Sequence, residues 1–257
     1  MKFNHIEGAV VDMDGVLWRS NTPLPAMEEL FQWFDEHKIP YVLATNNSGK
    51  TPADYVEKLA SLGVPDVAQQ NIITSGTATA IYMQGRYPPG ARVSVFGMPG
   101  LKQIIAEAGY DVVDDPDVQP DVVVAGINFD MTYASLRRAA LHIRAGADFI
   151  GTNPDLTFPT PEGLVPGAGS LIAALQAATD VEPFIVGKPY ESMFRAALKI
   201  TGTRPENTVM IGDRLDTDIQ GAQQVGMKTV LLFTGVTSAE QLASPATTVW
   251  PDVAYEG

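Results

Sequence analysis

Side chains of the types that handle phosphate follow short apolar runs at four places in this chain. In chain order they are Asp12 with Asp14, Thr45 with Asn46 and Asn47, Lys188, and Asp213 with Asp216 and Asp218. Together they supply two carboxylates in one turn, a hydroxyl beside amide donors, a lone cation and a second acidic cluster. These groups are the ones needed to hold a divalent metal and a phosphate and to attack phosphorus.

The carboxylates of Asp12 and Asp14 are only two residues apart. They repel each other unless a cation is close or one of them is protonated, and both conditions suit phosphoryl transfer. One aspartate, charged and touching Mg²⁺, can attack phosphorus and form an aspartyl-phosphate. The other can protonate the leaving oxygen and then deprotonate the hydrolytic water. Gly15 would allow a sharp turn after the pair, because glycine tolerates positive φ.

The other motifs complete this site. Asp213, far from Asp12 in the sequence, is the expected further metal ligand. Asp218 or Asp216 would orient its carboxylate, or a metal-bound water, without binding the metal itself. Mg²⁺ keeps several waters, so two or three protein oxygens suffice, and Mn²⁺ or Co²⁺ could replace it in an oxygen site. Lys188 would neutralise the attacking carboxylate and the phosphate oxygens.

The Thr45 hydroxyl and the backbone amides of Asn46 and Asn47 would cradle a phosphate oxygen. Each motif alone also has an ordinary structural interpretation. Asparagines favour turns, and Asp216, Thr217 or Asp218 could simply cap a helix that runs to about Gln224. The combination of all four motifs in this order favours a catalytic site.

Alternating apolar runs and amphipathic segments are typical of a mostly parallel sheet covered by helices. We expect strands near 7–12, 41–44, 72–75, 92–96, 122–126, 149–151, 184–186 and 208–211. We expect helices near 26–38, 51–62, 76–84, 98–108, 132–145 and 169–178, and a loop over 157–168. In such sheets ligands bind at the carboxyl ends of strands, so motifs at these ends can converge.

Two segments rich in proline, glycine or acidic residues, 85–90 and 180–183, suggest domain boundaries. The predicted fold class is therefore α/β, with a Rossmann-like three-layer core and an inserted α/β domain. The core would take residues 1–80 and 182–257, and the inserted domain residues 81–181.

Composition excludes several classes of protein. The chain has 257 residues, of which 45% are hydrophobic, enough for a sizeable core. Its net charge of −13 argues against a nucleic-acid binder. The absence of cysteine excludes thiolate chemistry and fits a reducing compartment. No signal peptide or apolar run of about 18 residues is present, so we expect a cytoplasmic protein that does not bind membranes.

These motifs resemble those of the haloacid dehalogenase (HAD) superfamily of aspartate-nucleophile phosphatases, most closely the NagD-like p-nitrophenyl phosphatase subfamily. The resembling segments are 11–17, 45–48, 186–189 and 210–219, and the similarity runs the full length of the chain. It implies a Mg²⁺-dependent phosphatase of small phosphomonoesters, such as sugar phosphates, phosphoglycolate or p-nitrophenyl phosphate. Asp12 would be the nucleophile and Asp14 the general acid and base. The metal ligands would be Asp12, the Asp14 carbonyl and Asp213.

The resemblance also implies that the inserted domain is a cap that selects the substrate, a small phosphorylated metabolite. Asn153 and Phe158 are the cap residues expected to contact it. Phe158 stands where pyridoxal phosphatases of the family carry a histidine, which weakens a pyridoxal phosphate assignment. The glycines at 167 and 169 open the next helix, and we favour close packing over a phosphate cradle. Relatives often dimerise through the cap, so a homodimer is expected from the resemblance alone.

Two other functions stay open at this point. A phosphotransferase or mutase would use the same aspartate with an acceptor other than water. A non-catalytic phospholigand sensor would need no second aspartate two residues after the first, which favours hydrolysis. The isolated His5, His37 and His142 are not expected to bind a ligand; His37 and His142 would be surface or partly buried helix residues.

Overall fold

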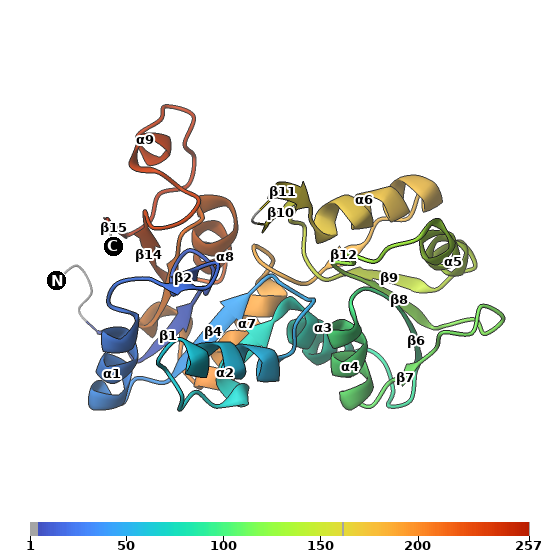
Figure 1. Cartoon of the computed structure of the whole chain (residues 1–257), viewed down its shortest axis with the longest axis horizontal. Helices are drawn as coiled ribbons and strands as arrows, with labels where there is room; N and C mark the ends of the chain where they lie inside the picture. Colours follow the sequence, from blue (N-terminus) through green and yellow to red (C-terminus); the bar gives the residue numbers. More distant parts are fainter. Residues whose placement is uncertain (1–4, 161, 257) are drawn as a thin grey trace. The chain divides into compact units, whose positions relative to one another are not determined.

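The computed structural model describes residues 5–160 and 162–256, and residues 1–4, 161 and 257 lie outside it. The chain forms two compact units. The first unit contains the chain up to Thr45, Pro52–Ile73 and the chain from Lys188 onward. The second contains Asn46–Thr51 and Thr74–Gly187. Both units alternate strands with helices (Figure 1), so the predicted α/β fold class is confirmed.

The first unit is built on a six-stranded sheet with β1 near its centre. β1 pairs in parallel with β13 on one side and with β4 on the other. In spatial order the strands are β15 (Val253–Tyr255), β14 (Lys228–Leu232), β13 (Thr208–Gly212), β1 (Gly8–Val11), β4 (Tyr41–Thr45) and β5 (Ile72–Thr74). The chain runs from β1 to one side of the sheet and returns to build the other. The carboxyl ends of β13, β1 and β4 therefore lie where such sheets bind ligands.

Helices cover this sheet because their apolar residues recur at helical spacing. Met27, Phe31 and Phe34 of α1 are buried in one cluster with Val11 and Leu43 of the sheet. α7 contacts β1 and β4, and α8 contacts β14. The helices are α1 (Met27–His37), α2 (Pro52–Ser61), α7 (Glu191–Thr201), α8 (Gln220–Gln224) and α9 (Ala239–Leu242). Short turns of helix occur at Gln69–Asn71, Pro205–Asn207 and Leu215–Ile219, and β2 (Trp18–Arg19) pairs with β3 (Thr22–Pro23).

The second unit is built on a five-stranded parallel sheet. In spatial order its strands are β12 (Phe184–Ile185), β9 (Asp148–Gly151), β8 (Val122–Ala125), β6 (Arg92–Phe96) and β7 (Asp111–Val112). In Figure 1, α5 (Tyr133–Arg144) and α6 (Ala168–Thr179) cover one face, and α3 (Ser75–Gln84) and α4 (Pro99–Glu107) cover the other. A separate hairpin is formed by β10 (Thr157–Thr160) and β11 (Gly163–Pro166).

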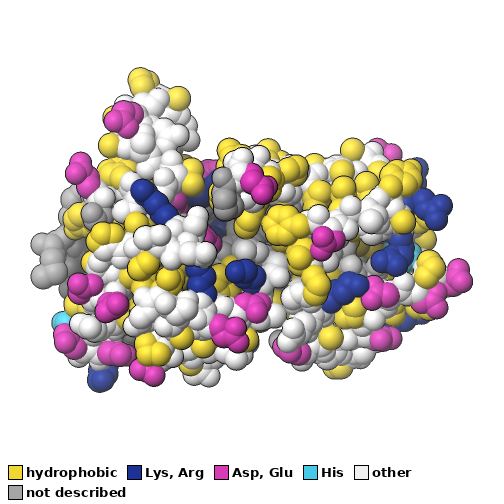
Figure 2. Space-filling model, in the orientation of Figure 1, with side chains coloured by type: hydrophobic (Ala, Val, Ile, Leu, Met, Phe, Trp, Pro, Cys, Tyr) yellow, Lys and Arg dark blue, Asp and Glu magenta, His cyan; other side chains and the backbone are white. Residues whose placement is uncertain are grey.

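The surface carries both acidic side chains and exposed apolar side chains. On the face shown in Figure 2, acidic side chains are scattered rather than gathered in one patch. Exposed apolar side chains of the second unit include Leu156 and Leu164 around the hairpin, at 64% and 73% exposure, with Phe129 and Tyr133 before and within α5. Among the helices that the structure describes, none has the length and apolar character that a membrane crossing requires.

Some element predictions are wrong or incomplete. The sequence predicts a loop over 157–168, but residues on both sides of its tip pair as β10 and β11. Pro159 and Pro166 hide the strand pattern, because proline is rare in paired strands. The helix expected before Gln224 begins as a π-helical turn, Leu215–Ile219. The predicted boundary segments, 85–90 and 180–183, both lie inside the second unit.

His142, which the sequence places on a helix surface or partly inside, is 5% exposed on α5. Neither ring nitrogen has a hydrogen-bond partner among the described residues. Burial disfavours the charged ring and lowers the pKa of His142. Protonation of this buried imidazole therefore opposes folding.

We predict that His142→Leu weakens the acid sensitivity of folding. As pH falls through about 6.5, the ordinary histidine pKa, the unfolded chain binds the proton first, so wild-type stability decreases. Urea titrations at about pH 7 and about pH 5, on either side of that value, measure this change. The variant should lose less stability between them than the wild type. His37→Gln, at an exposed position, should keep the wild-type pH dependence, and equal behaviour of both variants would contradict the prediction.

Candidate active site

Three of the predicted motifs lie at the carboxyl ends of neighbouring strands in the first unit. Asp12 follows β1, Thr45 ends β4 and Asp213 follows β13. Thr45 is 4% exposed, so its hydroxyl belongs to the buried part of this edge. Lys188 differs from the other three, because the strand before it, β12, belongs to the sheet of the second unit.

Lys188 lies at the centre of a buried charge cluster in the first unit. Its ammonium forms an ion pair with the Asp12 carboxylate and a second one with Asp218 at 2.7 Å. It also donates to the Ala44 carbonyl at 3.2 Å, just before the end of β4. All three charged residues are less than a tenth exposed. The cation thus joins the ends of β1 and β4 to the turn that follows β13.

Asp213 is held from one side only. Its Oδ2 accepts the backbone N–H of Val236 at 2.6 Å. Its Oδ1 is buried and has no hydrogen-bond partner within residues 5–160 and 162–256. Two glycines make room for this carboxylate, since a Cβ at Gly15 would lie 2.6 Å from Oδ2 and one at Gly235 only 1.8 Å. Gly15 has φ of +88°, as the sharp turn after the aspartate pair requires.

Burial sets the protonation of these groups. Desolvation, with the nearby Asp218 and Asp213 carboxylates, raises the pKa of Asp12 well above its ordinary value although Lys188 opposes this. Desolvation and Asp218 raise the pKa of Asp213 to about 6. For Lys188 burial acts against the charged form, but Asp12 and Asp218 outweigh it and its pKa is raised. The carboxylates therefore need more positive charge than one lysine provides.

A divalent cation fits this need. Asp12, Asp213 and Asp218 each offer a carboxylate oxygen, and these oxygens lie within 4.8 Å of one another. Three carboxylates against one ammonium leave two negative charges in a buried place. The unpaired Asp213 Oδ1 is a hard oxygen of the kind that Mg²⁺ binds. The donor set therefore suits such an ion, with Asp12 and Asp213 as the ligands that the resemblance implies.

Asp14 is placed apart from this cluster. It is exposed, and its Oδ1 accepts the indole N–H of Trp18 at 2.8 Å. Trp18 itself is fully buried, stacks on Tyr55 with ring centroids 6.4 Å apart, and has the Lys58 ammonium 4.0 Å from its ring centroid. A buried, immobile donor thus fixes the direction of an accessible carboxylate.

The two aspartates of the last motif separate in role. Asp218 is fully buried, pairs with Lys188 and accepts the N–H of Arg214 at 3.1 Å. Asp216 instead forms an exposed ion pair with the Arg214 guanidinium at 2.8 Å. Of these two aspartates Asp218 is the one that belongs to the buried cluster, and its role in orienting Asp213 or a metal-bound water stays a prediction.

The remaining predicted residues belong to the second unit. Asn46 donates to both carboxylate oxygens of Asp155, at 3.2 and 3.1 Å. The Asn153 amide donates to the Asn46 carbonyl at 2.7 Å, and Asn153 is 2% exposed. The Asn47 side chain accepts the Gly49 N–H at 2.8 Å. Asn153 therefore braces the loop that carries Asn46, and its contact with a substrate stays a prediction.

Phe158 and the glycines at 167 and 169 also lie in the second unit. Phe158, in β10, is half-buried and packs edge-on against Phe129 with centroids 5.5 Å apart. A Cβ at Gly169 would lie 2.2 Å from the Pro154 carbonyl oxygen, and one at Gly167 2.3 Å from that of Asp155. The preferred interpretation of these glycines as close-packing positions is confirmed.

The loop after β14 is the part of the site that the sequence motifs miss. Thr234 donates to the Gly15 carbonyl at 2.5 Å, Val236 donates to the Asp213 carboxylate, and Thr237 donates through its N–H to the Asp213 carbonyl at 3.0 Å. Its sequence signal is a glycine, Gly235, two positions after the apolar run that ends at Phe233. That signal is weak because glycine is common in such turns.

Comparison with known proteins places the chain among phosphatases. Residues 9–111 match the family model described as haloacid dehalogenase-like hydrolase, and residues 185–255 match one described as HAD-hydrolase-like. The acid sugar phosphatase of Staphylococcus epidermidis is 33% identical over 93% of this chain and 91% of its own length.

Solved structures agree with this match. The 4-nitrophenylphosphatase of Thermotoga maritima is 35% identical, with a TM-score of 0.91, covering 98% of this chain and 94% of that protein. The glycerol phosphate phosphatase of Mycobacterium tuberculosis, solved with magnesium, is 32% identical with a TM-score of 0.87, covering 97% and 74%. Both likenesses span the first and the second unit.

The tight fit at Gly235 leads to a prediction about metal binding. Gly235→Ala should displace the Asp213 carboxylate, because the new Cβ would lie 1.8 Å from its Oδ2. We expect Mg²⁺ affinity, measured by isothermal titration calorimetry, to fall about 10–100-fold, the usual effect of disturbing a ligand's support. Gly85→Ala is the matched control, since the nearest atom to its Cβ would be 3.8 Å away. Unchanged Mg²⁺ binding by a folded Gly235→Ala variant would disprove the support role.

Proposed function

This chain belongs to the haloacid dehalogenase-like hydrolases, and within them to the NagD-like p-nitrophenyl phosphatases, and on that premise we propose a Mg²⁺-dependent phosphatase that forms a phosphoaspartate at Asp12. It is a phosphoric monoester hydrolase. The proposed substrates are small phosphomonoesters, sugar phosphates among them. The observation that carries the proposal is the buried contact of Asp12 with Lys188, beside the unpaired oxygen of Asp213.

In the first step the Asp12 carboxylate attacks phosphorus, and the bond from phosphorus to the ester oxygen breaks. Asp14 gives a proton to that leaving oxygen. In the second step water attacks the phosphoaspartate, Asp14 takes its proton, and phosphate leaves with the Asp12 carboxylate restored. The accessible position of Asp14 supports this assignment, because an alcohol and a water must both reach it.

Lys188 and Asp218 stabilise charge in both steps. The Lys188 ammonium contacts the attacking carboxylate and would meet the negative phosphate oxygens. Asp218 holds that ammonium at 2.7 Å and keeps it directed inward. When bound by Asp12, the Asp14 carbonyl and Asp213, Mg²⁺ would supply the positive charge that this cluster lacks.

The role of the second unit follows from the family and stays a proposal. We assign substrate selection to it, with Phe158 as the contact residue offered by the β10–β11 hairpin. A phenyl ring contributes an apolar contact and no hydrogen bond to a ligand's polar groups. A homodimer and a cytoplasmic location likewise stay predictions.

The Asp12→Asn variant tests the covalent route. It should remain folded and lose nearly all turnover of p-nitrophenyl phosphate, because an amide is a poor nucleophile. A chelator should stop the wild-type enzyme, and added Mg²⁺ should restore it. Asp216→Asn is the control, because Asp216 is exposed and its carboxylate pairs with the Arg214 guanidinium, and it should keep wild-type turnover. Wild-type rates from Asp12→Asn would exclude the mechanism.

Trp18→Phe tests how the proton-transfer group is held. Phenylalanine keeps the packing on Tyr55 but removes the N–H that reaches Asp14. A hydrogen bond to a charged group is worth about 1.5–3 kcal/mol, so we expect kcat to drop at least about tenfold with little change in KM. Trp33→Phe, in the exposed part of α1, should leave both constants unchanged. A matching drop in both tryptophan variants would argue against a positioning role for Trp18.

A further inference from the structure

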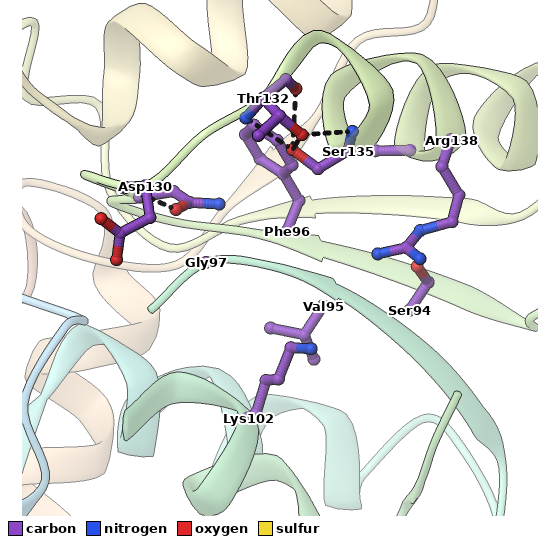
Figure 3. Close-up of a pocket in the computed structure, with 11 residues that line it drawn as sticks. Ser94, Val95, Phe96, Gly97, Lys102, Asp130, Thr132, Ser135 and Arg138 are labelled. Atoms are coloured by element: carbon purple, nitrogen blue, oxygen red, sulfur yellow. Dashed lines mark hydrogen bonds between the residues drawn. The ribbon is translucent and has the colours of Figure 1, made fainter. Parts of the chain in front are cut away.

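The second unit contains a small cavity that no step of the proposed reaction uses. It has a volume of about 130 Å³ and lies along the edge of β6, between α4 and α5 (Figure 3). We call it the β6-edge cavity. Its polar lining includes Ser94 of β6, Lys102 of α4 and Arg138 of α5. These three side chains come from three different elements, which is how folded proteins assemble a binding site.

Ser94 is the first sign that the β6-edge cavity is made for a ligand. The residue is 4% exposed and lines the cavity. Within residues 5–160 and 162–256, its hydroxyl has no hydrogen-bond partner. The hydroxyl oxygen itself is reachable from the cavity, so it can donate to a group bound there. A ligand in the cavity would give this hydroxyl the partner that the protein does not.

The open edge of β6 adds a backbone donor. β7 pairs only with Arg92 and Val93 at the start of β6. The Val93 carbonyl accepts the N–H of Val113, so Val93 faces the β7 side. Alternate residues of a strand direct their N–H groups to the same edge, so the N–H of Val95 faces this side as well. Val95 lines the cavity and lies beyond Val93, the last residue of β6 that pairs with β7.

Two cations flank the β6-edge cavity and share one carboxylate. Lys102 pairs with Asp114 at 2.6 Å, while Arg138 donates to the Asp114 carbonyl at 2.9 Å and lies 3.9 Å from its carboxylate. One positive charge is thus left over at this end, in a chain whose net charge is −13. Asp130 also lines the cavity, but in Figure 3 its carboxylate points away from Lys102 and Arg138.

We propose that the β6-edge cavity binds a small oxyanion, of the size of phosphate or a short carboxylate. A hydroxyl donor, a backbone N–H and two cations are the groups that recognise such an ion. The volume of about 130 Å³ holds a few water-sized groups and is well below the roughly 300 Å³ at which pockets for larger organic ligands begin. This site is distinct from the cluster around Asp12, so it would bind an anion that is not being hydrolysed.

Residue-resolved NMR on the ¹⁵N-labelled full chain tests the proposal. Titration with inorganic phosphate should shift the signals of Val95, Ser94 and the Arg138 side chain saturably. Phosphate bound near Asp12 shifts a separate set of residues, so the two sites are distinguished in one titration. Malonate serves as the carboxylate probe. Shifts at Val95 and Ser94 with either anion support the site, and the anion that produces them identifies its class.

Matched variants decide whether the cavity is responsible. Arg138→Gln should weaken phosphate or malonate binding at Val95 at least tenfold, and Ser94→Ala should weaken it several-fold. Arg137→Gln is the control, because Arg137 is the neighbouring exposed arginine of α5 and lies outside the cavity. Equal affinities for the Arg138 and Arg137 variants would overturn the proposal. So would saturable shifts confined to residues near Asp12, or none with either anion. If Arg138→Gln does not fold, unchanged binding by Ser94→Ala overturns it instead.

Discussion

The burial of several charges at one sheet edge is the constraint on which the first unit depends. Asp12, Asp213 and Asp218 are almost fully removed from water, and Lys188 is the cation that touches two of them. Removing one partner of such a buried pair typically costs about 3–5 kcal/mol, because an uncompensated charge remains. The cluster is therefore tolerable only with further positive charge. The three carboxylates carry two more negative charges than Lys188 balances, so a divalent cation is needed at the same place. That concentration of charge is the physical basis of the phosphoryl transfer proposed for this site.

Backbone geometry makes this arrangement possible. The parallel register of β13, β1 and β4 brings residues distant in sequence to one edge. Gly15 and Gly235 then leave just enough space for the Asp213 carboxylate, whose direction is set by the Val236 N–H. Side chains with charge are thus oriented largely by backbone groups, which have little freedom to move. This explains why the loop after β14 matters although it offers no acid, base or cation of its own.

The sequence predicts the reactive groups far better than their supports. Asp12, Lys188 and Asp213 are identifiable because each is a charged residue at, or one position beyond, the end of an apolar run. The hairpin β10–β11 was hidden by its prolines, and Val236 acts through its backbone, which any residue could supply. Trp18 was identifiable as a neighbour of the motif, but only the fold shows that its N–H reaches Asp14. Contacts made by backbone atoms or by packing leave almost no trace in one sequence.

The polar groups of the first unit form buried ion pairs, whereas those around Asn46 in the second unit form a hydrogen-bond network. In the first unit, the buried carboxylates pair with a buried lysine, so their charge is confined and can act on a bound group. In the second unit, Asn46 donates to the Asp155 carboxylate, and its carbonyl accepts from the Asn153 amide and the Ser75 hydroxyl, so hydrogen bonds fix this loop. Well-paired hydrogen-bond networks of this kind rigidify a structure. The reacting charges and this bracing network therefore belong to different units of the chain.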